Sequence, residues 1–297
     1  MTVSESLAAK GRGMGGQHAL RWRLRQVRSA AGVLGAGLCA ALAASALLII
    51  FGYVVAKGVE ALNLDFFIHL PRPVGITGGG VSNGIVGTAI IVALAAFLAT
   101  PISVLAGVYL ALFGRGFVAE ALRFLADVLS GVPSIVIGLF AYTVLVAPLK
   151  HFSAISAAFA FAILMLPIIV RTSEEAIRSV PTVVREGALA LGMSVYTATV
   201  HVILPAARGA IITGLLLGIA RVTGETAPLL FTAFGSQFWE TNPSNPMAAL
   251  ALQVFTYAIA PYEDYHRQAW AGALILIVAV FIVNVAARIA LRTRTSR

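Results

Sequence analysis

The chain has 297 residues, of which 21 are basic and 12 acidic; 59% are hydrophobic and the mean hydropathy is +0.93. A charged fraction of 11% is far below the roughly 25% of soluble domains. The composition therefore excludes a soluble globule and indicates a helical membrane protein, since long apolar runs replace the alternation of a barrel. Cys39 is the only cysteine, which excludes a disulfide scaffold.

Six apolar runs reach the ~20 residues that a helix needs to cross ~30 Å of hydrocarbon. They cover residues 29–56, 84–113, 128–150, 152–170, 209–234 and 269–287. The first run is too long for a signal peptide and five more follow it, so we expect an uncleaved anchor. Six spans place both termini on the same side of the membrane.

The basic residues predict which side that is. Sixteen lie in the N-terminal tail (1–28), the loop between runs two and three, the loop 171–208 and the C-terminal tail (288–297). Four lie in the other loops: Lys57, Arg72, Lys150 and Arg267. Because cytoplasmic loops carry the excess of Lys and Arg, we expect both termini in the cytoplasm. In a membrane protein, the net charge of +9 then reports orientation rather than nucleic-acid binding.

Two external loops separate the spans. Loop 57–83 holds Pro71, Pro73 and the glycine run 78–80, which predicts irregular structure. Loop 235–268 contains Asn242-Pro243 and then an apolar stretch, 247–259, that is too short to span. This stretch either lies on the outer surface or packs between spans. The spans from residue 84 to 287 would form a five-helix core behind the first helix.

The motifs of energy-converting and hydrolytic enzymes are missing. None of the three lysines belongs to a G-x-x-x-x-G-K-[ST] loop, and there is no H-E-x-x-H, cysteine pair or G-x-S-x-G. Glu263, Asp264 and His266 are close in sequence, but a solvated loop face explains them better than a metal site. We expect a passive path whose energy comes from a partner, with no catalytic residue, metal or cofactor in this chain.

The cytoplasmic loop 171–208 is amphipathic rather than apolar. Pro181 suits the first turn of a helix, and a stripe of small and apolar residues follows: Val183, Val184, Gly187, Ala188 and Leu191. Gly192 would end this helix and Ser194 would cap a second one, with Pro205 opening the fifth span. This pattern predicts a compact knob at the membrane face, or an ordinary amphipathic connector.

A longer motif favours the knob. Glu186-Gly187-Ala188, three residues, Gly192, nine residues and then Val202-Ile203-Leu204-Pro205 resembles the EAA motif of ABC importer permeases (E-A-A, three residues, G, nine residues, I-x-L-P). Gly187 and Val202 depart from it, and Gly187 loosens the helix by ~1 kcal/mol relative to Ala. The resemblance implies that Glu186, Gly187, Ala188, Gly192 and Pro205 belong to a coupling element that docks on a cytoplasmic ATPase.

Three further runs narrow the resemblance. ARVTGETAPLLFT (220–232), SGVPSIVIGLF (130–140) and LMLPIIVRTSEE (164–175) are similar to the phosphate-specific (Pst) ABC importer permeases, in particular the A-type subunit. This implies an all-α, MetI-like type I core in the bacterial plasma (inner) membrane that imports inorganic phosphate. It also implies a C-type permease as heterodimer partner, an ABC ATPase dimer that carries ATP and Mg²⁺, and an external phosphate-binding protein.

Arg221 and Glu225 lie inside the fifth run. An arginine at mid-membrane costs at least ~2.5–3.5 kcal/mol on insertion scales. Four residues apart, the two side chains share a helix face and can pair, although Arg before Glu is the weaker order. Pro228 crowds the Gly224 carbonyl, so we expect the span to kink or unwind there.

Two interpretations of this polar patch remain open. Arg221, Glu225, Thr223, Thr226 and Pro228 would line the translocation path or a gate, with Arg221 contacting phosphate oxygens. Alternatively, the pair is a structural salt bridge to the partner permease. Ser130 and Ser134, which flank Pro133, would face the same cavity or bond their own helix backbone.

Other functions are weighed against phosphate import. A permease for another oxyanion, such as phosphonate, sulfate or molybdate, is the alternative within the same class, because the binding protein decides specificity and is a separate chain. A self-sufficient secondary transporter or channel is disfavoured because acidic residues do not string along the spans. A membrane enzyme lacks a nucleophile and base.

Overall fold

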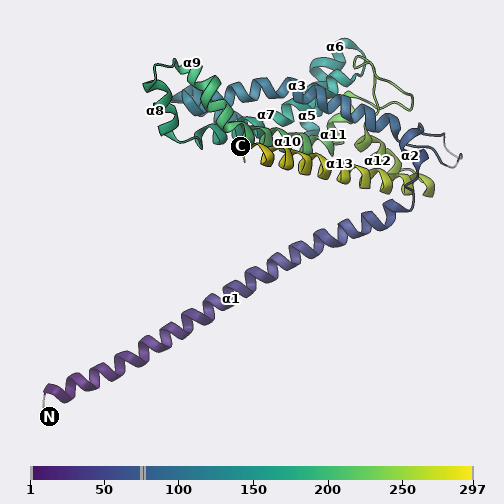
Figure 1. Cartoon of the computed structure of the whole chain (residues 1–297). Coiled ribbons are helices and arrows are strands. Elements are labelled where there is room, and N and C mark those ends of the chain that lie inside the picture. Colours follow the sequence, from purple (N-terminus) through teal and green to yellow (C-terminus); the bar gives the residue numbers. More distant parts are fainter. Residues whose placement is uncertain (1–2, 74–75, 77, 296–297) are drawn as a thin grey trace. The chain divides into compact units, whose positions relative to one another are not determined.

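The computed structural model describes residues 3–73, 76 and 78–295 (Figure 1). These residues are almost entirely helical, and in this part of the chain the single β feature is an isolated bridge between Phe234 and Met247. The chain divides into two compact units, Met1–Val55 and Ala56–Arg297. The far ends of both basic tails and residues 74–75 and 77 of loop 57–83 lie outside the described residues.

The first unit is formed by α1 (Val3–Val59), whose last residues belong to the second unit. Its segment Arg28–Val59 is long and apolar enough to cross a membrane. Its side chains from 28 to 53 are exposed, as expected of a helix that faces lipid. The predicted span 29–56 is therefore confirmed as an apolar helix.

The second unit holds four more helices of spanning length: α3 (Ser82–Leu112), α7 (Ala154–Arg178), the segment Val195–Thr223, and the part of α13 (Glu263–Thr295) up to Val285. A sixth span exists only as a bent pair. This pair joins α4 (Phe117–Gly131) to α5 (Ser134–Ala141), which continues through a π-helical turn, η1 (Tyr142–Val146), into α6 (Ala147–Leu149). The chain is therefore a multi-pass membrane protein, and its described residues form five or six spans.

The third predicted span, 128–150, is not a single continuous helix. The two halves of the bent pair meet at 103°, with Val132 and Pro133 in extended conformation between them. Pro133 has no N–H to donate and its ring clashes with the carbonyl four residues earlier, so the helix stops. We call residues 131–134 the elbow.

The fifth predicted span starts much earlier than Gly209. The helix begins with α9 (Val195–Ala198), passes through a π-helical turn, η2 (Thr199–Ile203), and continues as α10 (Leu204–Thr223). Pro205 therefore lies within the span rather than at its start. In η2 the Leu204 N–H bonds the carbonyl of Thr199, five residues back, and this wider turn accommodates the proline. The turn η1 stands in the same position before Pro148.

Four short helices lie at two ends of the second unit. In Figure 1, α8 (Thr182–Ala190) and α9 lie at one end, and α2 (Leu64–Ile68) and α12 (Leu250–Ala258) lie at the other. Loops predicted for opposite sides of the membrane are thus at opposite ends. The apolar stretch 247–259 packs between longer helices, because α12 is largely buried against α13 and α3.

The core is formed where α3 and α7 pack along each other. Small residues line this contact: a Cβ added to Gly107 would come 2.5 Å from the Ser173 Cβ, and Ala95, Ala99 and Ala157 are fully buried. Because lipid is as apolar as leucine, membrane helices associate through such close packing. This seam holds α7 in place, and α7 carries the knob.

Candidate functional site: the knob, the α10–α11 break and the Glu174 cluster

The knob consists of α8, α9 and the turn between them. Pro181 precedes the first residue of α8, and the helix ends as the motif predicts: Gly192 has φ +83°, its N–H bonds the Leu189 carbonyl (3.0 Å), and the Met193 N–H bonds the Ala188 carbonyl (3.2 Å). This is the Schellman pattern, which requires a left-handed residue at that position. Ser194 caps α9 by accepting the Thr197 N–H at 3.1 Å. Both predicted helices and both caps are confirmed.

The EAA-like residues divide into two groups. Glu186, Gly187 and Gly192 are exposed on the knob, whereas Ala188 is buried against the rest of the chain. Pro205 is exposed in the first turn of α10. Large apolar side chains are also exposed on the knob, at Val183, Leu191 and Tyr196. Val183 and Leu191 lie outside the spanning segments, where exposed apolar side chains are typical of a protein–protein contact.

The fifth span unwinds where Pro228 predicted. Helix α10 ends at Thr223, and α11 (Ala227–Thr232) starts after three intervening residues, with Pro228 in its first turn. We call residues 224–226 the α10–α11 break. Non-helical backbone at membrane depth is tolerated only inside protein or beside a water-filled cavity.

Arg221 and Glu225 flank this break and form a loose pair. The Arg221 Nε and Glu225 Oε1 atoms are 4.0 Å apart, and the side chains are 40% and 24% exposed. A contact at this distance is weak, as the Arg-before-Glu order led us to expect. The guanidinium is thus only partly neutralised by its neighbour.

The hydroxyl groups assigned to the path already bond backbone. Thr223 donates to the Ile219 carbonyl (2.7 Å), Thr226 to the Ala251 carbonyl of α12 (3.4 Å) and Ser130 to the Asp127 carbonyl (2.7 Å). Ser134 is half-buried in the first turn of α5. The backbone-bonding alternative, raised for Ser130 and Ser134, therefore describes Ser130. Thr223 bonds its own helix in the same way, and both oxygens can still accept a hydrogen bond.

The elbow reaches the break through α5. Helices α5 and α11 pack together, and a Cβ added to Gly138 would lie 2.6 Å from the Pro228 Cα. Real Cβ atoms essentially never come that close, so only glycine permits this backbone approach. The SGVPSIVIGLF and GETAPLLFT runs, almost a hundred residues apart, thus meet in space.

A cluster of charged residues was not foreseen as a site. It joins α4 to the last turns of α7, and we call it the Glu174 cluster: Arg123, Asp127, Arg171, Glu174 and Arg178. The Glu174 side chain is only 4% exposed. Its Oε1 accepts from Arg123 Nε at 2.8 Å and lies 2.9 Å from Arg178 Nη2, while Arg171 Nη1 is 3.6 Å from Oε2.

Further bonds anchor the cluster. Arg171 pairs with the Asp127 carboxylate through its Nε at 3.0 Å and also through Nη2. Arg123 donates to the carbonyls of Leu110 (3.0 Å) and Gly114 (3.3 Å) at the end of α3. In the sequence these arginines were interpreted only as signals of membrane orientation, so the cluster was not predicted. The spacing of 171, 174 and 178 on one helical face was the available clue.

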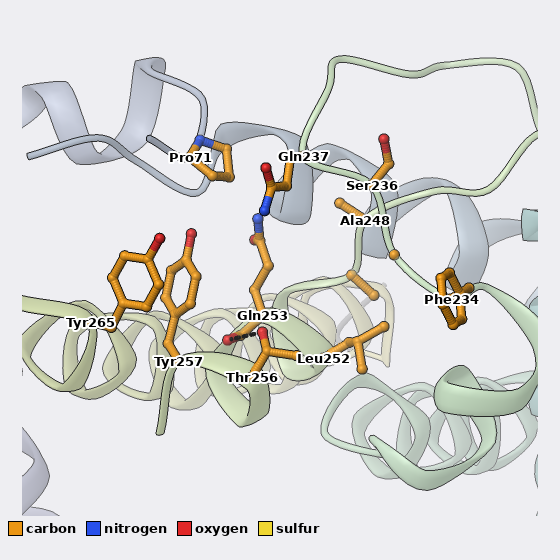
Figure 2. Close-up of a pocket in the computed structure, with 12 residues that line it drawn as sticks. Pro71, Phe234, Ser236, Gln237, Ala248, Leu252, Gln253, Thr256, Tyr257 and Tyr265 are labelled. Carbon is orange, nitrogen blue, oxygen red and sulfur yellow. Dashed lines mark hydrogen bonds between the residues drawn. The ribbon is translucent and has the colours of Figure 1, made fainter. Parts of the chain in front are cut away.

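A cavity of about 290 Å³ lies where the two predicted external loops meet (Figure 2). Pro71 comes from loop 57–83, and Gln237, Gln253 and Tyr257 come from loop 235–268. In Figure 2 the Gln253 side chain rises from α12 toward Gln237. Its Nε2 donates to Asn83 Oδ1 (3.0 Å). Burial, and to a lesser degree the neighbouring Tyr265, raise the pKa of Tyr257 to about 12, so the tyrosine is neutral at physiological pH.

Comparison with known proteins decides the family. The family described as binding-protein-dependent transport system inner membrane component matches residues 103–295. This chain belongs to that family. Its curated relatives include the phosphate transport system permease proteins PstA of Yersinia pestis, 41% identical over 79% of this chain and 80% of the relative, and of Haemophilus influenzae, 42% identical over 79% and 83%.

Solved structures confirm the fold. The inward-facing MetNI methionine ABC transporter covers 72% of this chain and 95% of its own, with a TM-score of 0.59 and 15% identity. A crystal structure of an amino acid ABC transporter with histidines gives a TM-score of 0.50, with 22% identity over 72% of this chain and 92% of its own. The MetI-like fold and the resemblance to Pst permeases are therefore confirmed, and the chain is a transport permease.

Proposed function

We propose that this chain is the permease subunit of an ABC importer that moves inorganic phosphate into the cytoplasm. The observation that carries the proposal is the identity of 41–42% with PstA permeases over 79% of the chain. The aligned part of the chain includes the permease core, which has the knob at one end and the α10–α11 break in its interior.

The test is phosphate uptake by cells whose own copy of this chain is deleted. Radiolabelled phosphate uptake should be lost on deletion and restored by the cloned chain, and unlabelled phosphate should compete whereas sulfate, molybdate and phosphonate should not. Competition by one of these oxyanions but not by phosphate would assign the permease to that oxyanion instead. Restored uptake in cells that lack the ATPase would indicate a secondary transporter.

The partners follow from the knob and from the family. A separate ABC ATPase dimer, holding ATP and Mg²⁺, would dock on α8 and α9, where Val183, Leu191 and Tyr196 supply apolar contacts beside Glu186. The knob end would face the cytoplasm together with both termini, because basic residues cluster in its loops. A C-type permease would complete the path as heterodimer partner, and an external phosphate-binding protein would dock at the end that carries α2 and α12.

Arg221 would be the residue that meets phosphate. Its guanidinium is permanently charged and offers several donors to phosphate oxygens. Its 4.0 Å contact with Glu225 leaves much of that capacity unused. Glu225 would orient Arg221 or lock a gate, since a free carboxylate would repel the anion. Thr223, Thr226, Pro228, Ser130 and Ser134 would line the path; the competing role for Arg221 and Glu225 is a salt bridge to the partner permease.

A further inference from the structure

The Glu174 cluster joins elements that the proposed function treats separately. On one side, Glu174 and Arg178 form the last turn of α7, and α8 begins at Thr182. On the other side, Arg123 and Asp127 belong to α4. The cluster therefore connects the end of α7, which leads into the knob, with α4, which leads into the elbow.

The second half of the connection starts at the elbow. Helix α4 turns by 103° into α5, and α5 rests on α11 through the backbone contact of Gly138 with Pro228. Helix α11 begins two residues after Glu225. Each step from α8 to the α10–α11 break is thus a covalent link, an ion pair or a close backbone contact.

Within this series of contacts, the ion pairs of Glu174 resist the separation of α4 from α7. Its carboxylate is buried, and moving α4 away from α7 would break its 2.8 Å bond to Arg123 and leave it with the arginines of its own helix, Arg171 and Arg178. Removing one partner of a buried ion pair is unfavourable. Arg123 simultaneously holds the end of α3 through the Leu110 and Gly114 carbonyls. The three helix ends should therefore move as one body.

We propose that Glu174 is a positioning residue for coupling: it transmits the displacement of the ATPase-bound knob to α4 and, through the elbow and α5, to the α10–α11 break. This inference rests on the proposed function. It assigns a role to a carboxylate that belongs to neither the knob nor the α10–α11 break.

The experiment uses the complete complex, reconstituted in lipid vesicles with its binding protein, and measures the number of ATP molecules hydrolysed per phosphate imported. Glu174→Gln keeps the shape and removes the charge. We expect that ratio to rise by about tenfold, within the range typical of coupling energies, while assembly and basal ATPase activity persist. The matched control is Glu175→Gln, because Glu175 is the exposed neighbour and should leave the ratio unchanged.

A second variant separates coupling from folding. If the Arg123 pairing carries the effect, Arg123→Gln should raise the ratio as well, and the double variant Arg123→Gln/Glu174→Gln should raise it no further than the larger single effect. An unchanged ratio in Glu174→Gln would overturn the proposal. So would loss of the assembled complex, or a parallel fall of hydrolysis and import, which would mark Glu174 as purely structural.

Failure of the proposed function would look different. In that case the unaltered complex itself would not import phosphate at the expense of ATP. The same ratio, measured with whichever oxyanion stimulates its ATPase, would still decide the role of Glu174.

Discussion

The contact between Gly138 and Pro228 offers a quantitative test of how α5 rests on α11. A Cβ at position 138 would lie 2.6 Å from the Pro228 Cα, whereas ordinary contact starts at 3.4 Å. Gly138→Ala therefore requires the two helices to separate by about 0.8 Å in a close-packed interior. Overpacking of this kind costs roughly 1–3 kcal/mol, and the better helix propensity of alanine offsets about 1 kcal/mol of it.

The matched control is Gly209→Ala within α10, where an added Cβ meets nothing within 4 Å. Because the gain in helix propensity is similar in both variants, their difference in stability isolates the overpacking cost, roughly 1–3 kcal/mol. The free energy of unfolding can be followed by tryptophan fluorescence of the purified chain during SDS titration in mixed micelles. A difference below about 0.5 kcal/mol, the usual effect of a surface substitution, would refute the close approach of α5 and α11.

Three further predictions concern the path, the knob and an external turn. Arg221→Gln and Arg221→Lys should both abolish phosphate uptake while the purified complex remains assembled, since lysine lacks the planar fork; disassembly would instead favour the salt bridge to the partner permease. Glu186→Lys and Gly192→Val should uncouple ATP hydrolysis from transport, the second because a β-branched residue at φ +83° costs roughly 1–2 kcal/mol; normal coupling in both would remove the knob from its docking role. The backbone N–H of Asn242 lowers the pKa of the Glu240 carboxyl, with further help from Asn245 and Thr241. Hydrogen-exchange protection of the Asn242 amide should therefore be full above the ordinary carboxyl pKa and fall as the pH drops through the lowered one; a similar pH dependence in Glu240→Gln would contradict this.

Features set by local backbone chemistry were predictable from sequence. Pro181, Gly192 and Ser194 fixed the ends of α8 and α9, because caps and left-handed turns depend on a few adjacent residues. Pro228 similarly predicted the α10–α11 break. Long apolar runs located five spans, with ends that shifted by several residues.

The proline effects that depend on neighbouring helices were not predictable. Pro101 and Pro167 lie inside α3 and α7 without ending them, Pro205 is accommodated by a π-helical turn, and Pro133 stops its helix altogether. Which outcome occurs depends on whether surrounding elements satisfy the freed carbonyl. No local rule distinguishes these prolines.

In the candidate site, too, some residues could be predicted from the sequence and others could not. Arg221 and Glu225 stood out because charges inside an apolar run need an explanation. Glu174 did not, since it lies at the end of a span among residues that orientation alone explains. Its partner Arg123 is 51 residues away, and only the packing of α4 on α7 brings the two together.

ATP-driven phosphate import by a complex that contains this chain underlies the roles proposed for the knob, the α10–α11 break and the Glu174 cluster. The most direct measurement is the ATPase activity of the purified complex in vesicles, with the binding protein on one side and phosphate added alone or replaced by sulfate, molybdate or phosphonate. We expect phosphate to stimulate ATP hydrolysis and to enter the vesicles in proportion to it, and the other oxyanions to do neither. Stimulation by another oxyanion but not by phosphate, or phosphate entry without ATP, would contradict this expectation.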